Sequence, residues 1–266
     1  MKGRVLIVAG SDSGGGAGIQ ADIKTVTALG AYAATAITAV TVQNTLGVSA
    51  IHQIPLDIVQ AQIKAVLDDI GADAVKTGML GTVGVIEAVM AALNGNEAPL
   101  IVDPVMVAKG GAALLESDAV AALKRHVLPR AALITPNLPE AEVLTGRQIA
   151  TPQAMRDAIK HLLDLGPKAV LLKGGHLAGA EIIDIYASAT GTQEWHDARI
   201  ATRHTHGTGC TLASAVATGF AQGLKPVDSI TRARRYVRRA LETAPGLGQG
   251  HGPLNHAHTV RPFTEE

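Results

Sequence analysis

The chain has little of several things that define other protein classes. It contains one cysteine among 266 residues, so no disulfide can form within it, and a reducing compartment fits. Aromatic residues make up 2% and charged residues 17%, whereas hydrophobic residues reach 47%. This composition excludes a disordered, highly charged polypeptide. A chain of this length and apolarity buries a sizeable core without cross-links.

An excess of charge and long apolar runs are also lacking. Lys plus Arg and Asp plus Glu each number 23, which gives a formal net charge of zero at pH 7. This balance argues against nucleic acid or an anionic membrane as the main partner. No run reaches the roughly 18 apolar residues of a membrane span, and the first residues lack a signal-peptide pattern. We therefore expect a cytoplasmic protein that binds small molecules.

Short apolar runs alternate with helical patterns along the chain. The expected strands are 4–9, 32–42, 48–54, 74–76, 100–102, 133–135 and 169–173, followed by a hairpin of 181–186 and 193–201. The expected helices are 19–29, 55–70, 82–93, 117–127, 139–145, 152–165, 208–222 and 227–244. This alternation predicts a mostly parallel sheet covered on both faces. No internal repeat or linker-like segment interrupts it, so we expect one domain over residues 1–266.

Unusual loops follow the expected strands. In an open α/β sheet the ligand binds outside the carboxyl ends of the strands. The loops at those ends cover residues 10–18, 76–79, 103–111, 136–140, 173–176 and 206–210. Because all of them reach the same rim, we expect the ligand there.

Several familiar motifs fail. Ser11-Asp12-Ser13-Gly14-Gly15 resembles the surroundings of a serine-protease nucleophile, but it follows the first strand of an α/β chain, and nothing else of that fold is present. The dinucleotide fingerprint needs glycine five residues after Gly14, where the chain has Ile19, which makes a dehydrogenase a distant alternative. The phosphate loop G-x-x-x-x-G-K-[ST] is absent.

Two groups of basic residues favour structural roles. His204 and His206 bracket one residue of a loop, and His256 and His258 lie near the C-terminus, without metal-ligand spacing on a helix. We expect them to be solvated or structural. The last expected helix carries arginines at 232, 234, 235, 238 and 239. Their spread over more than one face favours a solvated surface with ion pairs, with a nearby nucleotide phosphate or partner subunit as the alternative.

The segment from His206 to Cys210, H-G-T-G-C, opens an expected helix. Its two glycines let the backbone approach a ligand, and the helix N-terminus adds partial positive charge. This combination suits a transferring phosphoryl group. Cys210 lies in the first turn, where the same field lowers the pKa of a thiol, so we consider it a candidate base. Simple packing of a small residue is the structural alternative.

Three further residues at strand ends suit phosphate or metal chemistry. Lys173 precedes two glycines and can neutralise phosphate charge, unless it only extends into solvent. Glu140 can hold Mg²⁺ directly or through water. The structural alternative is a helix cap by Asn137 with Glu140 in the first turn. Asp103 is a second candidate magnesium contact.

Together these segments carry a resemblance to a known family. From about Val5 to His258 the chain resembles the hydroxymethylpyrimidine/phosphomethylpyrimidine kinases of thiamine biosynthesis, in the ribokinase-like superfamily. The supporting segments are A-G-S-D-S-G-G-G-A-G-I-Q-A-D (9–22), V-Q-N-T (42–45), K-T-G-M-L (76–80), D-P-V-M-V-A-K-G-G (103–111), T-P-N-L-P-E-A (135–141), L-K-G-G-H (172–176) and H-G-T-G-C-T-L (206–212). The resemblance implies one ribokinase-like kinase domain, folded as a three-layer α/β/α sandwich, and a homodimer.

The resemblance also implies a role for each matching position. Cys210 takes the place of the aspartate base of other ribokinase-like enzymes, and Gln43 matches the glutamine that binds the aminopyrimidine through its amide. Glu140 belongs to the motif linked to Mg²⁺, and Lys173 matches a phosphate-side lysine. The other matches are Gly10, Ala17, Asp22 and Met79 in the pocket wall and Gly207, Thr208 and Gly209 in the phosphate loop.

Small departures from the family pattern fall in two loops. Ser13 and Gly14 replace what is often Pro-Ser or Ser-Ser, and Gly110 replaces a frequent serine. These differences bear on loop flexibility and pocket closure. They leave every proposed chemical group in place.

The implied reaction is transfer of the γ-phosphate of Mg-ATP to 4-amino-5-hydroxymethyl-2-methylpyrimidine, followed by a second transfer that gives the diphosphate. If Cys210 is the base, replacing it with alanine should lower kcat by about 10²- to 10⁴-fold. A pyridoxine or pyridoxal kinase is the nearest alternative, because that branch also phosphorylates a hydroxymethyl group on a six-membered heteroaromatic ring. A non-catalytic pyrimidine sensor is a second alternative, against which Lys173, Glu140 and Cys210 argue.

Overall fold

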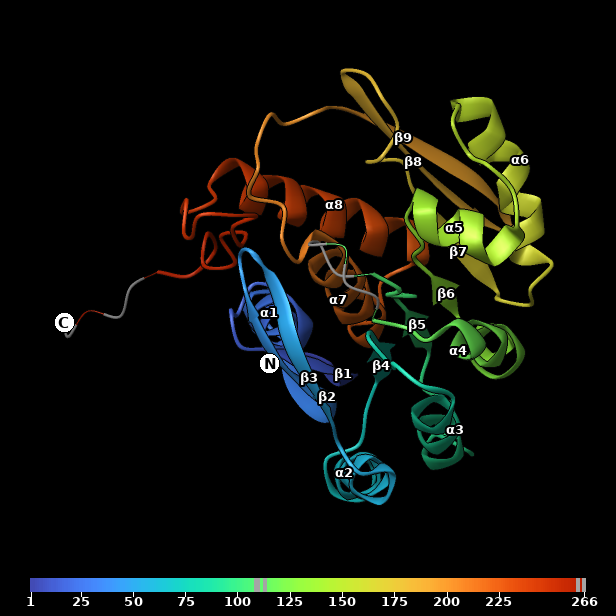
Figure 1. Ribbon diagram of the computed structural model, residues 1–266, viewed down its shortest axis with the longest axis vertical. Helices are drawn as coiled ribbons and strands as arrows, with labels where there is room; N and C mark the ends of the chain where they lie inside the picture. The colour runs from blue at the N-terminus through green and yellow to red at the C-terminus, as the bar shows by residue number, and fades with distance from the viewer. Residues whose placement is uncertain (108–110, 112–113, 262–263, 265–266) are drawn as a thin grey trace.

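A nine-stranded sheet forms the centre of the computed structural model, which describes residues 1–107, 111, 114–261 and 264 (Figure 1). The strands lie in the order β3-β2-β1-β4-β5-β6-β7-β8-β9. Strands β2, β1, β4, β5, β6 and β7 are parallel, whereas β3, β8 and β9 pair antiparallel at the two edges. Their bounds are β1 Arg4–Asp12, β2 Tyr32–Asn44, β3 Gly47–Gln53, β4 Ala74–Thr77, β5 Leu100–Val102, β6 Leu133–Ile134, β7 Ala169–Lys173, β8 Glu181–Ser188 and β9 Gly191–Ala198.

Helices cover both faces of this sheet. Helices α1, α7 and α8 lie on one face, and α2 to α6 lie on the other (Figure 1). Their bounds are α1 Gly18–Ala28, α2 Leu56–Asp69, α3 Val83–Ala92, α4 Ser117–Ala122, α5 Leu138–Thr145, α6 Pro152–Leu163, α7 Thr208–Ala221 and α8 Pro226–Glu242. The predicted three-layer sandwich with a mostly parallel sheet is therefore confirmed.

The two cores follow from the alternation of side chains along buried strands. In β1, Leu6 and Val8 belong to the core beneath α2 to α6. Val5 and Ile7 point to the opposite face, where they pack with Val26 of α1. All of these β1 side chains are fully buried, so this strand is apolar on both faces, as expected for parallel sheets.

Helix starts follow the local sequence. The side chain of Thr82 accepts a hydrogen bond from the backbone N–H of Val85 at 3.2 Å and so caps the N-terminus of α3. Asn137 and Glu140 form a capping box at α5: each side chain accepts from the other residue's backbone N–H, at 2.9 and 2.8 Å. These caps satisfy backbone donors that a helix start leaves free.

Two predicted elements end three or more residues earlier than the sequence suggested. The helix expected over 117–127 is α-helical only to Ala122, and a π-helical turn and a 3₁₀ turn continue to Arg130. Pro129 lies in that last turn, and a proline cannot donate the backbone hydrogen bond of a regular helix. Strand β9 ends at Ala198 rather than 201, because Arg199 turns back and donates to the carbonyl oxygens of Gly175, Leu177 and Gly179.

The strand order creates an opening beside β1. The chain passes from β1 to β2 on one side and returns to β4 on the other side of β1. Loops that leave β1 and β4 therefore diverge, and ligands of open α/β sheets bind at such a point. In the described part of the chain, no helix combines the length and apolarity needed to cross a membrane.

Candidate active site

The described residues enclose a cavity of about 900 Å³ at the carboxyl ends of the parallel strands. This volume lies near the upper end of the range for small-molecule sites, roughly 300–1,000 Å³. The cavity is lined by eleven of the twelve predicted site residues, namely Gly10, Ala17, Gln43, Met79, Asp103, Glu140, Lys173, Gly207, Thr208, Gly209 and Cys210. The predicted convergence of the rim loops is confirmed.

The loop before α7 approaches the cavity through its backbone. Gly207 has φ +81°, and a Cβ there would collide with the carbonyl oxygen of Gly16. A Cβ on Gly209 would lie 3.3 Å from Lys173 Nζ. Glycines at these positions therefore let the α7 N-terminus contact both the first loop and the charged groups of the cavity.

The thiol of Cys210 differs from the prediction. Burial raises its pKa to about 12, although the ammonium of Lys76 and the backbone N–H of Gly18 act in the opposite direction. The carboxylates of Asp22 and Asp103 raise it further. The expected lowering of this pKa is wrong, because removal from water, together with the two carboxylates, outweighs the groups that lower it. Cys210 is protonated at neutral pH.

Asp22 lies behind the cavity rather than in its wall. Its side chain is fully buried and accepts hydrogen bonds from Lys76 Nζ at 2.9 and 2.8 Å and from Ser214 Oγ at 2.6 Å. Lys76 is equally buried, yet it contributes to the cavity lining. The resemblance placed Asp22 in the pocket wall. The structure instead places Lys76, the ion-pair partner of Asp22, in that wall.

Lys173 occupies the end of β7, beside a carboxylate. Its Nζ lies 3.1 Å from Asp103 Oδ1, and the two side chains are 12% and 3% exposed. Burial lowers the pKa of Lys173, but Asp103 and Glu140 raise it more, so its pKa is held above the ordinary value. The alternative of a strand-end lysine in solvent is therefore excluded.

Glu140 combines the two roles that the sequence left open. It completes the capping box of α5 and also lines the cavity. Burial raises its pKa to about 7; Lys173 lowers the pKa and Asp103 raises it. A group with this pKa exchanges protons near neutrality.

The residues present fit a magnesium ion held partly by phosphate and water. No group of three or more His, Cys, Asp or Glu that could hold a metal occurs in residues 1–107, 111, 114–261 and 264. Mg²⁺ at nucleotide sites is usually held by one or two carboxylates plus substrate phosphates. Asp103 and Glu140 line the same cavity and repel each other electrostatically, a repulsion that a divalent cation would relieve.

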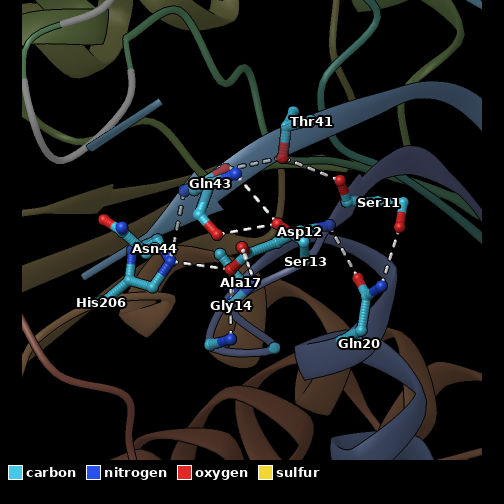
Figure 2. Close-up of polar contacts among 12 residues, drawn as sticks. Ser11, Asp12, Ser13, Gly14, Ala17, Gln20, Thr41, Gln43, Asn44 and His206 are labelled. Carbon is cyan, nitrogen blue, oxygen red and sulfur yellow. Dashed lines mark hydrogen bonds and ion pairs between the residues drawn. The ribbon is translucent and has the colours of Figure 1, made fainter. Parts of the chain in front are cut away.

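The part of the cavity beside β2 contains Gln43. The carboxamide of Gln43 contacts Thr41 and His206 (Figure 2). Met79 and Gly10 face each other nearby, because a Cβ on Gly10 would lie 2.6 Å from Met79 Cε. Glycine thus leaves room for the methionine side chain in the pocket wall.

Asp12 and His206 form a pair that the sequence interpretation missed. His206 Nε2 lies 2.8 Å from Asp12 Oδ2, and the residues are only 7% and 2% exposed (Figure 2). Both line the cavity. Asp12 stood in the segment set aside as a protease-like decoy, and His206 was expected to be solvated or structural. Both residues lie in predicted rim loops, and that position was the one sign in the sequence that they line the ligand site.

In the described part of the chain, three arginines of α8 form ion pairs, as predicted, but Arg234 and two guanidinium nitrogens of Arg232 are buried rather than solvated. Arg238 and Arg239 pair with Glu242 at 3.1 and 3.6 Å. Arg234 is 8% exposed and pairs with Asp184 and Asp197. Arg234 and Arg238 also line the cavity. The departure from the family pattern at Gly110 lies outside the described residues.

Comparisons with known proteins agree with this geometry. The family model described as phosphomethylpyrimidine kinase matches residues 12–255. The thiamine biosynthesis bifunctional protein ThiED of Geobacter sulfurreducens is 52% identical over 96% of this chain, which spans about half of that protein (52%). The hydroxymethylpyrimidine/phosphomethylpyrimidine kinase of Streptomyces coelicolor is 47% identical over 95% of this chain and 93% of that protein.

A solved structure supports the same assignment of fold. The Bacillus subtilis pyridoxal kinase in its ADP complex superposes with a TM-score of 0.89 at 35% identity, covering 97% of this chain and 98% of that one. The chain belongs to the phosphomethylpyrimidine kinase family.

Proposed function

We propose that the protein is an ATP-dependent kinase of thiamine biosynthesis, built as a single domain over residues 1–266. It phosphorylates 4-amino-5-hydroxymethyl-2-methylpyrimidine to the monophosphate and then to the diphosphate. The observation that carries the proposal is the convergence of Lys173, the α7 loop and Gln43 on one cavity. Identities of 52% to a protein named for thiamine biosynthesis and 47% to one named as a hydroxymethylpyrimidine/phosphomethylpyrimidine kinase support the substrate.

The charged groups near α7 bind and stabilise the transferring phosphoryl group. In the first transfer the hydroxyl oxygen forms a bond to the γ-phosphorus, and in the second an oxygen of the monophosphate does so. Each time the bond from that phosphorus to the β,γ-bridging oxygen breaks, releasing ADP. Lys173 and the backbone N–H groups of Gly207 and Gly209 face the charge that develops on the phosphoryl oxygens. Such preorganised donors lower the barrier because they need no reorientation during reaction.

Cys210 orients the substrate hydroxyl rather than removing its proton at the start. With a pKa near 12, its thiol is protonated in the substrate-free protein. Phosphoryl transfer passes through a loose transition state, in which the attacking oxygen carries little extra charge until late. The hydroxyl proton therefore leaves late, to a phosphoryl oxygen of the product and then to solvent.

Asp103 and Glu140 would hold Mg²⁺ at the phosphate end, directly or through water. The ion supplies charge neutralisation on the β- and γ-phosphates when it is bound. Lys173 keeps Asp103 in place through their ion pair. Product formation should therefore stop when a chelator removes the divalent ion and recover when Mg²⁺ is restored.

Product analysis tests the function directly. The purified protein is incubated with Mg-ATP and the aminopyrimidine alcohol, and in parallel with pyridoxal, and the products are separated by mass. Monophosphate followed by diphosphate of the pyrimidine is the expected result. If pyridoxal alone is phosphorylated, the protein is a pyridoxal kinase of the vitamin B6 branch. If neither alcohol gives a product, a non-catalytic sensor is favoured.

A pyridoxal kinase is the second candidate because a specific observation favours it. The protein of known structure reported above is a pyridoxal kinase with a TM-score of 0.89. Its identity to this chain, 35%, is lower than the 47% of the Streptomyces pyrimidine kinase. Gln43 also suits a ring nitrogen beside an exocyclic amine better than it suits a pyridoxal ring.

A homodimer in the cytoplasm completes the proposal. Strands β2 and β3 expose the apolar side chains of Val40, Val42 and Ile51, and Leu46 is exposed between these strands. An apolar patch of this kind supports contact with a second copy. ATP as the phosphoryl donor supports the cytoplasm as location. Light scattering of the pure protein should give twice the mass of 27.3 kDa.

A further inference from the structure

The carboxamide of Gln43 lies between two polar side chains (Figure 2). As drawn, Gln43 Oε1 lies 3.0 Å from Thr41 Oγ1, and Gln43 Nε2 lies 3.3 Å from His206 Nε2. The backbone is fixed separately: Ser13 Oγ donates to the carbonyl oxygen of Gln43 at 2.7 Å, and Gln43 N–H donates to Ser13 Oγ at 2.9 Å. Only the two ends of the amide can still exchange places, and they have nearly the same shape.

On the His206 side, the neighbour requires an acceptor. Asp12 already accepts backbone N–H bonds from Gly14, Gly16 and Ala17, at 2.8, 3.1 and 2.8 Å. Burial raises the pKa of Asp12, but the hydrogen bonds from His206 and Ala17 outweigh burial, so its pKa stays below the ordinary value. An ionised carboxylate only accepts, so His206 Nε2, at 2.8 Å from it, must carry hydrogen. A second N–H donor cannot face that hydrogen favourably.

On the Thr41 side, the neighbour requires a donor. Thr41 Oγ1 lies 2.9 Å from the backbone carbonyl oxygen of Ser11, which can only accept. A hydroxyl has one hydrogen, so once it is given to Ser11, only lone pairs remain to face Gln43. Thr41 therefore accepts from the amide nitrogen. His206 Nε2 has given its single hydrogen to Asp12 and keeps no lone pair to accept from an amide N–H, so the amide oxygen faces His206.

We propose that His206, held by Asp12, and Thr41, held by Ser11, lock the Gln43 carboxamide with Oε1 toward His206 and Nε2 toward Thr41, half a turn from the arrangement drawn in Figure 2. The lock fixes the order of acceptor and donor that the amide offers to a ligand. One oxygen lone pair and one N–H remain for that ligand. His206 and Thr41 are thus positioning residues for ring recognition.

The fixed order selects one orientation of the aminopyrimidine, an inference that rests on the proposed function. The ring nitrogen N3 accepts from Gln43 Nε2, and the 4-amino group donates to Oε1. The 5-hydroxymethyl group is attached on the other side of the amino group, so it lies on the His206 side. His206 begins the loop that leads to Cys210. The lock therefore directs the reacting hydroxyl toward the phosphate loop, as productive alignment requires.

The first test needs neither substrate nor activity. Nitrogen NMR of the substrate-free protein with ¹⁵N-labelled histidine reports which ring nitrogen of His206 carries hydrogen, and His206→Phe identifies the signal. Hydrogen on Nε2 is the expected result. Hydrogen on Nδ1 alone would overturn the lock, because Nε2 would then accept from Gln43. This result does not depend on whether the protein is a pyrimidine kinase.

The second test compares two rings by equilibrium binding. The 4-oxo analogue of the aminopyrimidine alcohol has N3–H and a carbonyl oxygen, so its donor and acceptor are reversed. The wild type should bind it about 100-fold more weakly than the amino compound, since both hydrogen bonds are mismatched. In the double variant His206→Phe with Thr41→Val the amide can turn, and we expect the ratio to fall below about tenfold.

Matched controls separate positioning from structure. His52→Phe and Thr35→Val change the same residue types on β3 and β2, away from the cavity lining, and should keep the wild-type ratio. A double variant that weakens both rings equally and keeps the ratio would contradict the proposal. A wild type that binds neither ring would refute the proposed function, and the His206 tautomer would still decide whether the lock exists.

Discussion

The two ends of the cavity are built on different principles. The transfer end contains charged groups in close pairs: Lys173 with Asp103, and Lys76 with Asp22 behind Cys210. The recognition end consists of Gln43 and its neighbours Thr41 and His206, which are joined by directional hydrogen bonds. Charge acts over distance and tolerates varied phosphate positions, whereas hydrogen bonds of fixed order distinguish one ring from another.

From this contrast we expect the transfer end to determine kcat and the recognition end to determine which ring is selected. Changes at the transfer end should slow the reaction for any alcohol that binds. Changes at the recognition end should alter KM and the choice of ring while leaving the transfer step nearly intact.

Lys173→Met removes the cation that faces the phosphoryl group at the transfer end and should have the largest effect. We expect kcat to fall about 10³-fold, because one preorganised electrostatic donor is typically worth 10²–10³ and Asp103 also loses its partner. Steady-state kinetics measure the loss, and circular dichroism checks the fold. Lys160→Met, an exposed lysine in α6, is the matched control and should leave kcat unchanged. An unaltered kcat in Lys173→Met would exclude the lysine from transfer.

The thiol of Cys210 should react unusually slowly with iodoacetamide. Its pKa of about 12 predicts alkylation at pH 7.5 at least about 100-fold slower than in the same protein unfolded in guanidinium chloride. The rate should keep rising about tenfold for each pH unit up to pH 10, because the thiolate fraction does. A rate that saturates below pH 8.5 would show a lowered pKa and restore the interpretation of Cys210 as a base.

Protonation of His256 should destabilise the folded protein at helix α7, whose N-terminus carries the phosphate loop. His256 contacts Thr211 in the first turns of α7, with Nε2 and Oγ1 2.9 Å apart, and burial lowers its pKa to about 4. The unfolded chain binds this proton at higher pH than the folded protein. The contribution of neutral His256 to the free energy of unfolding is therefore fully present above the ordinary pKa of 6.5. It is lost as the pH falls from 6.5 to about 4.

The loss amounts to about 3 kcal/mol of unfolding free energy over that range. Urea unfolding at a series of pH values measures it. In His256→Gln the amide can still contact Thr211 without titrating, so the acid-dependent part of the loss should shrink by about this amount. An equal pH dependence in the two proteins would remove His256 as the cause.

Gly10→Ala should have the smallest effect and should affect recognition alone. The new Cβ would lie 2.6 Å from Met79 Cε, the flexible end of a side chain that can move aside. We expect KM for the aminopyrimidine to rise about threefold to tenfold, with kcat and the KM for ATP unchanged. In Gly207→Ala the new Cβ would collide with the backbone of Gly16, which cannot move aside as a methionine side chain can. This variant should therefore destabilise the fold. A fall in kcat for Gly10→Ala would break the division between the two ends.

The sequence predicted the layers and the rim because both follow from local patterns. Alternating strands and helices fix a parallel sheet, and its carboxyl edge gathers the segments that carry Lys173 and Glu140. Gln43, in β2, was matched only through the family resemblance. Helix caps such as Thr82 are also local, since cap and first turn are neighbours in the chain. The end of β9 depends on the contacts that Arg199 makes with a distant loop. The end of the helix expected over 117–127 depends on the turns that contain Pro129.

The missed features depend on burial or on distant partners. Asp12 and His206 are 194 residues apart, and no motif spacing connects them. The position of Asp22 depends on Lys76, which reaches it from β4. The pKa of Cys210 depends mainly on desolvation and on the nearby charges of Lys76, Asp22 and Asp103, which are known only once the packing is known.

A competition assay tests the central claim, that this cavity recognises and phosphorylates an aminopyrimidine. The aminopyrimidine alcohol and pyridoxal are supplied at equal low concentration with Mg-ATP in one vessel, and the initial ratio of their phosphates gives the ratio of the kcat/KM values. We predict that the aminopyrimidine phosphate forms at least about tenfold faster, and that Gln43→Ala reduces this preference. Faster formation of pyridoxal phosphate by the wild type would contradict the account.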